Sequence, residues 1–277
     1  MSASSGTLPG RESPIGVFDS GVGGLTVVRA IERLLPQETV IYFGDTARVP
    51  YGSKSPETVI RFALEDASFL ASKRVKMIVV ACNTASSVSL PALREKFSVP
   101  ITGVIEPGAR TAVEATHNGS VGVIGTLGTI GSGAYQKALR AAGSGVGMVV
   151  AQPCPLLVPL VEEGWLDGDI TRMVVERYAA PLVREHVDTL VLGCTHYPLL
   201  KPVLGQVMGP EVTLVDSAEA TACEVRDRLA DRDLLADDAV AEGGFYVSDI
   251  PLKFQEIAQR FLGRTIPLVT QVEVGEL

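Results

Sequence analysis

Short apolar runs alternate with stretches of helical spacing along almost the whole chain, and this alternation constrains the fold more than any other feature. Each run is rich in β-branched residues and is bounded by turn-forming residues, which is typical of buried strands. The strands expected from this pattern cover residues 15–18, 40–43, 77–81, 101–104, 121–124, 146–150, 190–192, 212–215 and 244–247. The helices expected between them cover residues 25–35, 57–72, 87–97, 132–142, 169–185, 197–208 and 251–262. Such alternation predicts an α/β fold with parallel sheets covered by helices on both faces.

The pattern restarts near residue 120, which predicts two similar halves. The segment GVFDSG at residues 16–21 opens the first half, and GVIGTL at residues 122–127 opens the second. Later, KMIVVACNT at residues 76–84 has a counterpart in DTLVLGCTH at residues 188–196. We therefore predict two pseudo-symmetric α/β domains with the active site in the cleft between them.

Composition and charge narrow the class of protein. With 46% hydrophobic residues and 20% charged residues, the chain is typical of a globular protein. A net charge of −8 argues against a nucleic-acid-binding face, which needs a basic surface. The most apolar stretch, Met148 to Val161, is interrupted by prolines, and no run approaches the roughly 18 residues of a membrane span. Residues 1–12 are small and polar, unlike a secretory signal, so we predict a frayed tail and a cytoplasmic protein that handles small molecules.

The chain has four cysteines, and their spacing predicts neither a zinc site nor a redox motif. Cys82, Cys154, Cys194 and Cys223 include no pair separated by two residues. Disulfides are uncommon in a cytoplasmic chain of this size. We therefore expect Cys154 and Cys223 to act as small apolar side chains, and we predict no metal site.

Cys82 and Cys194 differ from the other two because each follows a predicted strand and precedes a predicted helix. Ligands bind at the carboxyl ends of strands in open parallel sheets. A helix N-terminus favours anions, so we expect a thiol pKa below its free value of about 8.5. Two opposed thiols suit a racemase, because one removes a proton from a carbon and the other returns a proton to the opposite face. The alternative is that both are packed core residues; the matched pair with polar neighbours favours catalysis.

A glycine-rich turn follows the first predicted strand. Asp19 is followed by Ser20, Gly21, Val22, Gly23 and Gly24, which permits a tight turn and close approach of a ligand. The alternative is a simple cap on the next helix. Two of these glycines and Asp45 also loosely match a dinucleotide-binding pattern, although Thr26 occupies the place of the third glycine.

Two further side chains suit acid/base chemistry. His196 lies two residues after Cys194, where an imidazole can donate to a substrate carboxylate or carry a proton. Glu162 follows the proline-interrupted apolar stretch and is a candidate partner for that imidazole. The alternatives are a structural histidine and a solvent-exposed glutamate.

Four segments together resemble the glutamate racemase family. They are FDSGVGGLT at residues 18–26, GDTARVPYG at 44–52, ACNTAS at 81–86 and GCTHYP at 193–198. They occur in the family's order and span nearly the whole chain. The resemblance implies interconversion of L- and D-glutamate without a cofactor, which supplies D-glutamate for peptidoglycan synthesis and hence for the cell wall and cell shape. Families of this type are often dimeric, and we predict a homodimer.

The resemblance also implies roles for individual residues. Cys82 acts on D-glutamate and Cys194 on L-glutamate, and Asp19, His196 and Glu162 assist the proton transfers. The implied substrate-binding residues are Asp19, Ser20, Pro50, Tyr51, Gly52, Asn83, Thr84, Thr126, Thr195 and His196. It further implies that residues 1–106 with 217–277 form one domain and residues 107–216 the other.

Three other functions compete with this hypothesis. An aspartate or hydantoin racemase uses the same two-cysteine logic and differs in the length and polarity of its pocket. A nicotinamide-dependent oxidoreductase binds a cofactor. A non-catalytic two-lobed protein binds its ligand without exchanging the α-proton, so replacing either cysteine separates the racemases from the last two.

Overall fold

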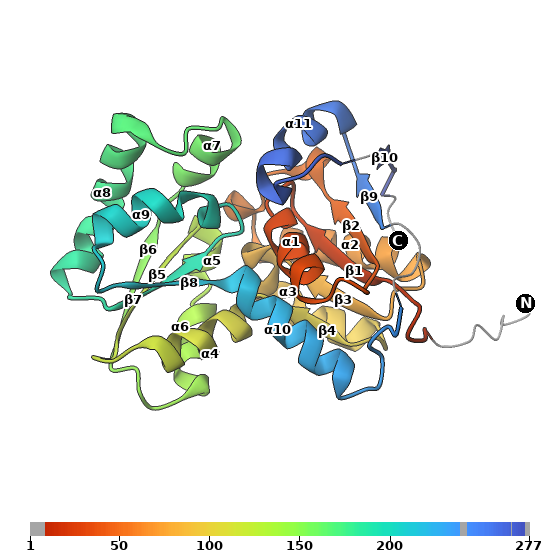
Figure 1. Ribbon diagram of the computed structural model, residues 1–277, viewed down its shortest axis with the longest axis horizontal. Coiled ribbons are helices and arrows are strands. Elements are labelled where there is room, and N and C mark those ends of the chain that lie inside the picture. The colour runs from red at the N-terminus through yellow and green to blue at the C-terminus, as the bar shows by residue number, and fades with distance from the viewer. Residues whose placement is uncertain (1–8, 239–242, 267, 275–277) are drawn as a thin grey trace, which may run out of the picture.

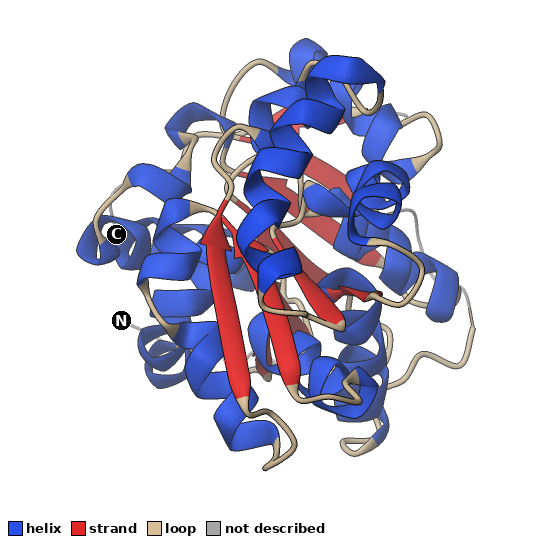
Figure 2. Cartoon of the chain, turned by 90° about the vertical axis from the view of Figure 1, so that its left-hand side faces the viewer, coloured by secondary structure: helices blue, strands red, loops and turns tan. Residues whose placement is uncertain are grey.

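The structure is a computed structural model that describes residues 9–238, 243–266 and 268–274. Most of the predicted N-terminal tail falls on residues 1–8, outside this part. Two parallel sheets carry helices on both faces (Figures 1 and 2), so the predicted α/β class is confirmed. Among the described residues, every helix is too short or too polar to cross a membrane.

The first sheet has six strands and the second has four. The six-stranded sheet has the order β10-β9-β2-β1-β3-β4, and the four-stranded sheet has the order β6-β5-β7-β8. We call the parts built on them the first lobe and the second lobe. The strands of the first are β1 (Ile15–Asp19), β2 (Val40–Gly44), β3 (Met77–Val80), β4 (Ile101–Gly103), β9 (Gly244–Val247) and β10 (Val269–Gln271). Those of the second are β5 (Ser120–Gly125), β6 (Met148–Pro153), β7 (Thr189–Gly193) and β8 (Thr213–Asp216).

The two sheets share one topology. The order β2-β1-β3-β4 in the first lobe matches β6-β5-β7-β8 in the second, so β3 and β7 occupy equivalent positions. All neighbouring strands in both sheets are parallel. The predicted pair of pseudo-symmetric halves is confirmed, and β9 and β10 extend only the first sheet. The domain boundaries at residues 106/107 and 216/217 stay a prediction.

Helices connect the strands and cover the sheets. Local signals start several of them: Ser55 caps α2 by accepting from the Thr58 amide at 3.4 Å, and Pro56 occupies the first helical position. The α-helices are α1 (Leu25–Leu34), α2 (Pro56–Ser72), α3 (Asn83–Lys96), α4 (Ile105–Ala115), α5 (Leu127–Gly131), α6 (Ala134–Ala142), α7 (Leu157–Glu162), α8 (Gly168–Arg184), α9 (Lys201–Met208), α10 (Ser217–Ala230) and α11 (Pro251–Leu262). Three short 3-10 helices are η1 (Thr46–Arg48), η2 (Tyr51–Ser53) and η3 (Tyr197–Leu200).

The structure corrects several expected elements. Helices α4, α5, α7 and α10 were not predicted, and α3 begins four residues before the predicted start at residue 87. Strand β6 runs to Pro153 rather than ending at Val150, because it is the edge strand of its sheet and an edge tolerates proline. In α4, Pro107 lies within the first turn, where its missing amide hydrogen is no loss.

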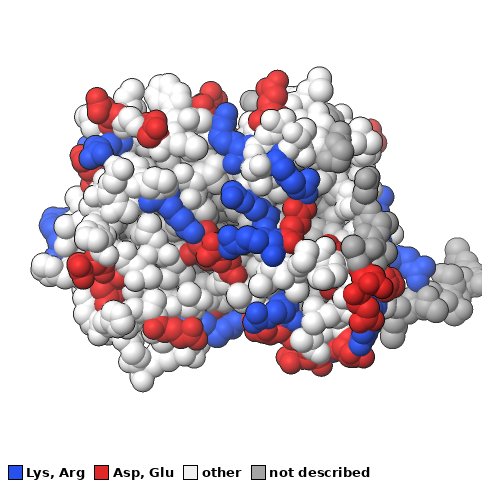
Figure 3. Space-filling view, viewed as in Figure 1, with Lys and Arg blue, Asp and Glu red and all other residues white. Residues whose placement is uncertain are grey.

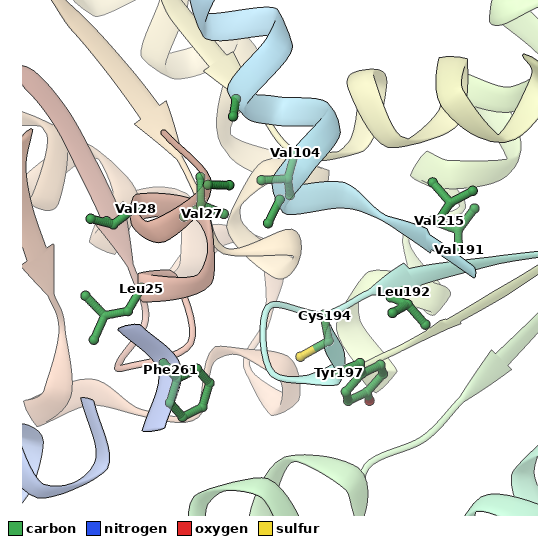
Figure 4. Close-up of a cluster of buried hydrophobic side chains, with 14 of the residues drawn as sticks. Leu25, Val27, Val28, Val104, Val191, Leu192, Cys194, Tyr197, Val215 and Phe261 are labelled. Carbon is green, nitrogen blue, oxygen red and sulfur yellow. The ribbon is translucent and has the colours of Figure 1, made fainter. Parts of the chain in front are cut away.

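One buried apolar cluster continues from the first lobe into the second. Leu25 and Val28 of α1 belong to it, as do Val191 of β7 and Val215 of β8 (Figure 4). Helix α10 also joins the lobes, because it packs on α1 and on α4 (Figure 1). The two lobes are therefore packed against each other.

Candidate active site

A cleft of about 350 Å³ lies between the lobes, near the carboxyl ends of β3 and β7. This is where open parallel sheets bind small molecules. All predicted site residues except Asp19 line it, and Asp19 is buried beside Ser20 at the end of β1. Those lining it are Ser20, Pro50, Tyr51, Gly52, Cys82, Asn83, Thr84, Thr126, Glu162, Cys194, Thr195 and His196.

Cys82 lies in the first-lobe wall, at the position immediately before α3. Its Sγ is 3.5 Å from Ser20 Oγ, and the residue is 6% exposed. Burial, together with the nearby carboxylate of Asp19, raises the pKa of the Cys82 thiol to about 12. The predicted lowering of this pKa is therefore wrong, because desolvation of the thiolate outweighs the helix N-terminus.

Asp19 is a buried carboxylic acid with an unused oxygen. Within the described part of the chain, its Oδ1 has no hydrogen-bond partner. Burial raises the pKa of Asp19 to about 6, although the charge of His196 acts in the opposite direction. Asp19 is thus mostly ionised at neutral pH, and its unpartnered oxygen can accept a proton.

Cys194 has a different partner in the second-lobe wall. Its Sγ lies 3.8 Å from His196 Nδ1, and His196 Nε2 lies 2.9 Å from Glu162 Oε1. Burial alone lowers the pKa of His196, but the hydrogen bonds to Cys194 and Glu162 outweigh it, and this pKa rises to about 10. The structure thus brings Cys194, His196 and Glu162 into one chain of contacts.

The helix expected after Cys194 also differs from the prediction. The short η3, with Pro198 as its second residue, comes first, and α9 begins only at Lys201. A single 3-10 turn has a weaker dipole than a long α-helix, because the dipole sums over aligned peptide units. The N-terminal field therefore acts on Cys82 more than on Cys194.

Neutral hydrogen-bonding groups line the cleft between the two cysteines. Thr84 Oγ1 and Thr126 Oγ1 are 2.9 Å apart, and Thr126 also caps α5 by accepting from the Thr129 amide at 3.1 Å. Asn83 Oδ1 accepts from the Tyr135 hydroxyl at 2.7 Å, whereas Asn83 Nδ2 is buried without a partner among the described residues. The lining that the structure describes contains no Lys or Arg. An anion bound here can therefore be held by hydroxyls, amides and backbone N–H groups, with the His196 imidazole as the cationic group of the lining.

Side chains of the second lobe pack against the glycine-rich turn that follows β1. A Cβ atom at Gly23 would lie 2.2 Å from Thr195 Oγ1 and 2.5 Å from His196 Nδ1. Thr26 Oγ1 donates to the Thr195 carbonyl at 3.1 Å. Asp45 pairs with Arg48 instead of facing a ligand. The turn therefore needs its glycine for contact between the lobes, which contradicts the dinucleotide alternative.

A buried ionic cluster, which the sequence analysis missed, supports the loop that carries Tyr51. Arg48 Nε lies 2.6 Å from Asp45, its Nη2 lies 2.9 Å from Asp66, and it also pairs with Glu65. The Tyr51 hydroxyl donates to Asp66 at 3.0 Å and also to Asp45. Asp66 and Glu65 lie on α2, so this cluster ties the loop to that helix. Asp45, Arg48 and Tyr51 fell within a recognised sequence segment, whereas Glu65 and Asp66 did not.

Charged side chains elsewhere form a mixed pattern. Figure 3 shows basic residues near the middle of one face, with acidic residues beside them. Arg33 and Lys201 line a groove outside the active-site cleft. Asp216 lies 2.7 Å from Lys201, and Glu219 lies 3.3 Å from Arg33, so acids accompany these cations. Over the described ranges, no group of three or more His, Cys, Asp or Glu residues is placed to hold a metal ion.

Comparison with known proteins assigns the family. The family model of Asp/Glu/Hydantoin racemase matches residues 15–225. The chain belongs to this family. A glutamate racemase of Geobacter metallireducens is 54% identical over 263 residues, which cover 94% of this chain and 96% of that protein.

Solved structures from the family share the two-lobed fold. A glutamate racemase isoform from Bacillus anthracis has a TM-score of 0.91 at 44% identity, covering 95% of this chain and 98% of that chain. One from Francisella tularensis, in complex with D-glutamate, has a TM-score of 0.89 at 37% identity over the same shares. The predicted family resemblance is therefore confirmed, and the family makes the chain a racemase of the isomerase class, as predicted.

Proposed function

We propose that the chain is a cofactor-independent glutamate racemase in which Cys82 and Cys194 transfer protons at opposite faces of the α-carbon. The observation that carries this proposal is the placement of the two thiols. They follow the equivalent strands β3 and β7 of two similar lobes, and both line one cleft. A relative that is 54% identical and a solved structure that is 44% identical are both glutamate racemases, which supports glutamate as the substrate.

The proton transfers balance without any external reagent. With L-glutamate, the Cys194 thiolate takes the α-proton and becomes a thiol, leaving a carbanion at the α-carbon. The Cys82 thiol then donates its proton to the opposite face and becomes a thiolate, which gives D-glutamate. The reverse reaction uses the same groups in exchanged roles.

The neighbours of each sulfur explain how both thiols reach the required protonation states. His196, whose pKa is raised to about 10, is an imidazolium that stabilises the Cys194 thiolate. Cys82, whose pKa is raised to about 12, starts as a thiol. To act on D-glutamate, the Cys82 thiol must first lose its proton, and Asp19 is the nearby carboxylate placed to accept it, since its pKa of about 6 leaves it ionised at neutral pH.

The polar lining suits an amino acid with two carboxylates. Asn83 lines the cleft, and its unpartnered Nδ2 is placed to donate to a carboxylate of the substrate. Thr84, Thr126 and Thr195 add hydroxyls on both sides of the cleft. Donors aimed at the α-carboxylate stabilise the charge that develops as the α-proton leaves.

The test is incubation of the purified protein with L-glutamate in deuterated water, without added cofactor. We expect D-glutamate with deuterium at the α-carbon, followed by chiral chromatography and NMR. Two separate bases also predict that the remaining L-glutamate gains little deuterium early in the reaction. A folded protein that exchanges no α-proton of glutamate contradicts the proposal; parallel incubation with aspartate tests the nearest alternative.

The biological setting extends the same proposal. D-glutamate formed here would enter peptidoglycan synthesis in the cytoplasm, and the active species would be a homodimer. Growth of a D-glutamate-requiring bacterium on expression of this chain, and its loss with Cys82→Ser, tests the cellular role. Analytical ultracentrifugation tests the dimer.

A further inference from the structure

Helix α11 belongs to the first lobe, but its last turn contacts the acid/base pair of the second lobe. Arg260 Nη1 donates to the Glu162 carbonyl at 2.7 Å and to the Val161 carbonyl at 3.3 Å. These carbonyls lie in the last turn of α7, where such groups lack the full set of intrahelical partners. A cationic guanidinium there also complements the negative end of the helix. Arg260 thus holds the backbone of the residue whose side chain contacts His196.

The next residue on α11 contacts His196 itself. The rings of Phe261 and His196 have centroids 5.2 Å apart and an interplanar angle of 84°. Phe261 is fully buried and belongs to the same apolar cluster as Cys194 and Tyr197 (Figure 4). An edge-to-face contact fixes the plane of a ring more strictly than general apolar packing does. Consecutive residues of one helix therefore restrain both Glu162 and His196 from the opposite lobe.

The turn after α7 is shaped to admit the guanidinium. Gly164 has φ of +80°, a backbone conformation that favours glycine. A Cβ atom at Gly164 would lie 3.0 Å from Cζ and from Nη2 of Arg260. The turn thus depends on glycine for its conformation and for the space that Arg260 occupies.

We propose that Arg260 and Phe261 are positioning residues that orient the Glu162–His196 pair toward Cys194 when the two lobes are packed together. They act through that pair, which contacts Cys194. Their effect therefore falls on the proton transfer at Cys194. This inference rests on the proposed two-cysteine function.

The main test compares Arg260→Ala with Arg264→Ala. Arg264 follows the same helix, but its Nη2 pairs with Glu32 of α1 at 2.5 Å, within the first lobe. Arg264→Ala therefore removes an equal charge without affecting the contact between α11 and α7. We expect kcat of Arg260→Ala to fall roughly 10- to 100-fold with a smaller change in KM, as for misplaced catalytic groups. Arg260→Lys should recover part of this loss, and Arg264→Ala should match the wild type.

Isotope effects separate positioning from a merely structural role. The equilibrium constant between L- and D-glutamate is one, because they are enantiomers. Any loss of kcat/KM in Arg260→Ala must therefore be equal in both directions. The primary isotope effect with α-deuterated L-glutamate, whose deuteron Cys194 takes, should rise in Arg260→Ala. The effect with α-deuterated D-glutamate should fall. Unchanged isotope effects with a lower melting temperature, or kinetics equal to those of Arg264→Ala, would overturn the proposal.

A readout without catalysis separates this inference from the proposed function. Hydrogen exchange of the amides at residues 160–165 should accelerate in Arg260→Ala and stay unchanged in Arg264→Ala. If the wild type does not act on glutamate but the exchange accelerates, the proposed function fails while the contact between the lobes stands. If the exchange is unchanged, the proposed positioning fails whatever the activity. Phe261→Leu, checked by its melting temperature, should accelerate no exchange in α7 but should lower kcat.

Discussion

The two cysteines occupy equivalent places in similar lobes, yet their surroundings differ. Cys82 lies directly at the N-terminus of α3, beside Ser20 and the buried carboxylic acid of Asp19. Cys194 lies before a short 3-10 helix, beside an imidazole that a glutamate restrains. The shared topology places both sulfur atoms at the cleft, and the loops around each sulfur determine which titratable group lies beside it. Cys82 has the Asp19 carboxylate as a neighbour and Cys194 has the His196 imidazolium, although both perform the same proposed step.

Replacing each cysteine should have the largest effect. We expect Cys82→Ser and Cys194→Ser each to lower racemisation by at least about a thousandfold, within the range for general acid/base groups. The two variants should differ in exchange: Cys82→Ser should still exchange the α-proton of L-glutamate, and Cys194→Ser that of D-glutamate. Proton NMR in deuterated water measures both.

The exposed Cys223 offers a control for this pair. Cys223→Ser should keep the wild-type rate. If both active-site variants exchange the same enantiomer, the assignment of one thiol to each face is wrong.

Removing the acidic neighbour of Cys82 should have the next largest effect. Asp19→Asn should lower kcat/KM about 100-fold, because Cys82 loses the group with which it exchanges protons. In the wild type, kcat/KM should fall as the pH decreases through about 6, since burial raises the pKa of Asp19 to that value and its protonated form is no base. The pH profile measures this acid limb, which Asp19→Asn should lack.

His196→Gln removes the corresponding neighbour of Cys194. It should lower activity by a similar factor but keep the acid limb near pH 6. An acid limb that persists in Asp19→Asn would assign it to another group.

Replacing the partner of His196 should have a smaller effect. Glu162→Gln should lower kcat about tenfold, because the Glu162 side chain is 40% exposed and solvent replaces part of its interaction. The pKa of His196 should fall from its raised value, because the Glu162 hydrogen bond supports the imidazolium. NMR titration of the imidazole measures the shift, and an unchanged His196 pKa would contradict the described contact.

The paired threonines should show the smallest effect. Thr84→Val and Thr126→Val each remove one hydroxyl from the cleft, and each should raise KM about fivefold, as for a hydrogen bond of about 1 kcal/mol. Only Thr126 caps a helix, so only Thr126→Val should also lower the melting temperature, by roughly 2–4 °C. Steady-state kinetics and calorimetry distinguish them; equal stability of the two variants would contradict the role of Thr126 as a cap.

Much of the fold and of the cleft follows from local patterns. The β-branched runs predicted all strands except β10, and the repeat around Cys82 and Cys194 predicted two similar halves. Helix α4 was missed because Pro107 and Gly108 lie in its first turn and indicate a loop. Helix α10 was missed because its many polar residues weaken its apolar spacing. Strand β10 has only three residues, too few for a periodic signal.

Local sequence patterns specify the alternating elements, the strand-end cysteines and the polar residues beside them, because these depend on neighbours in the chain. The pKa direction of Cys82 follows instead from the folded structure, since burial depends on everything packed around the sulfur. It also decided that Gly23 makes room for His196, and that α11 places Arg260 and Phe261 against α7 and His196. These contacts join residues far apart in sequence, and local spacing has no signal for them.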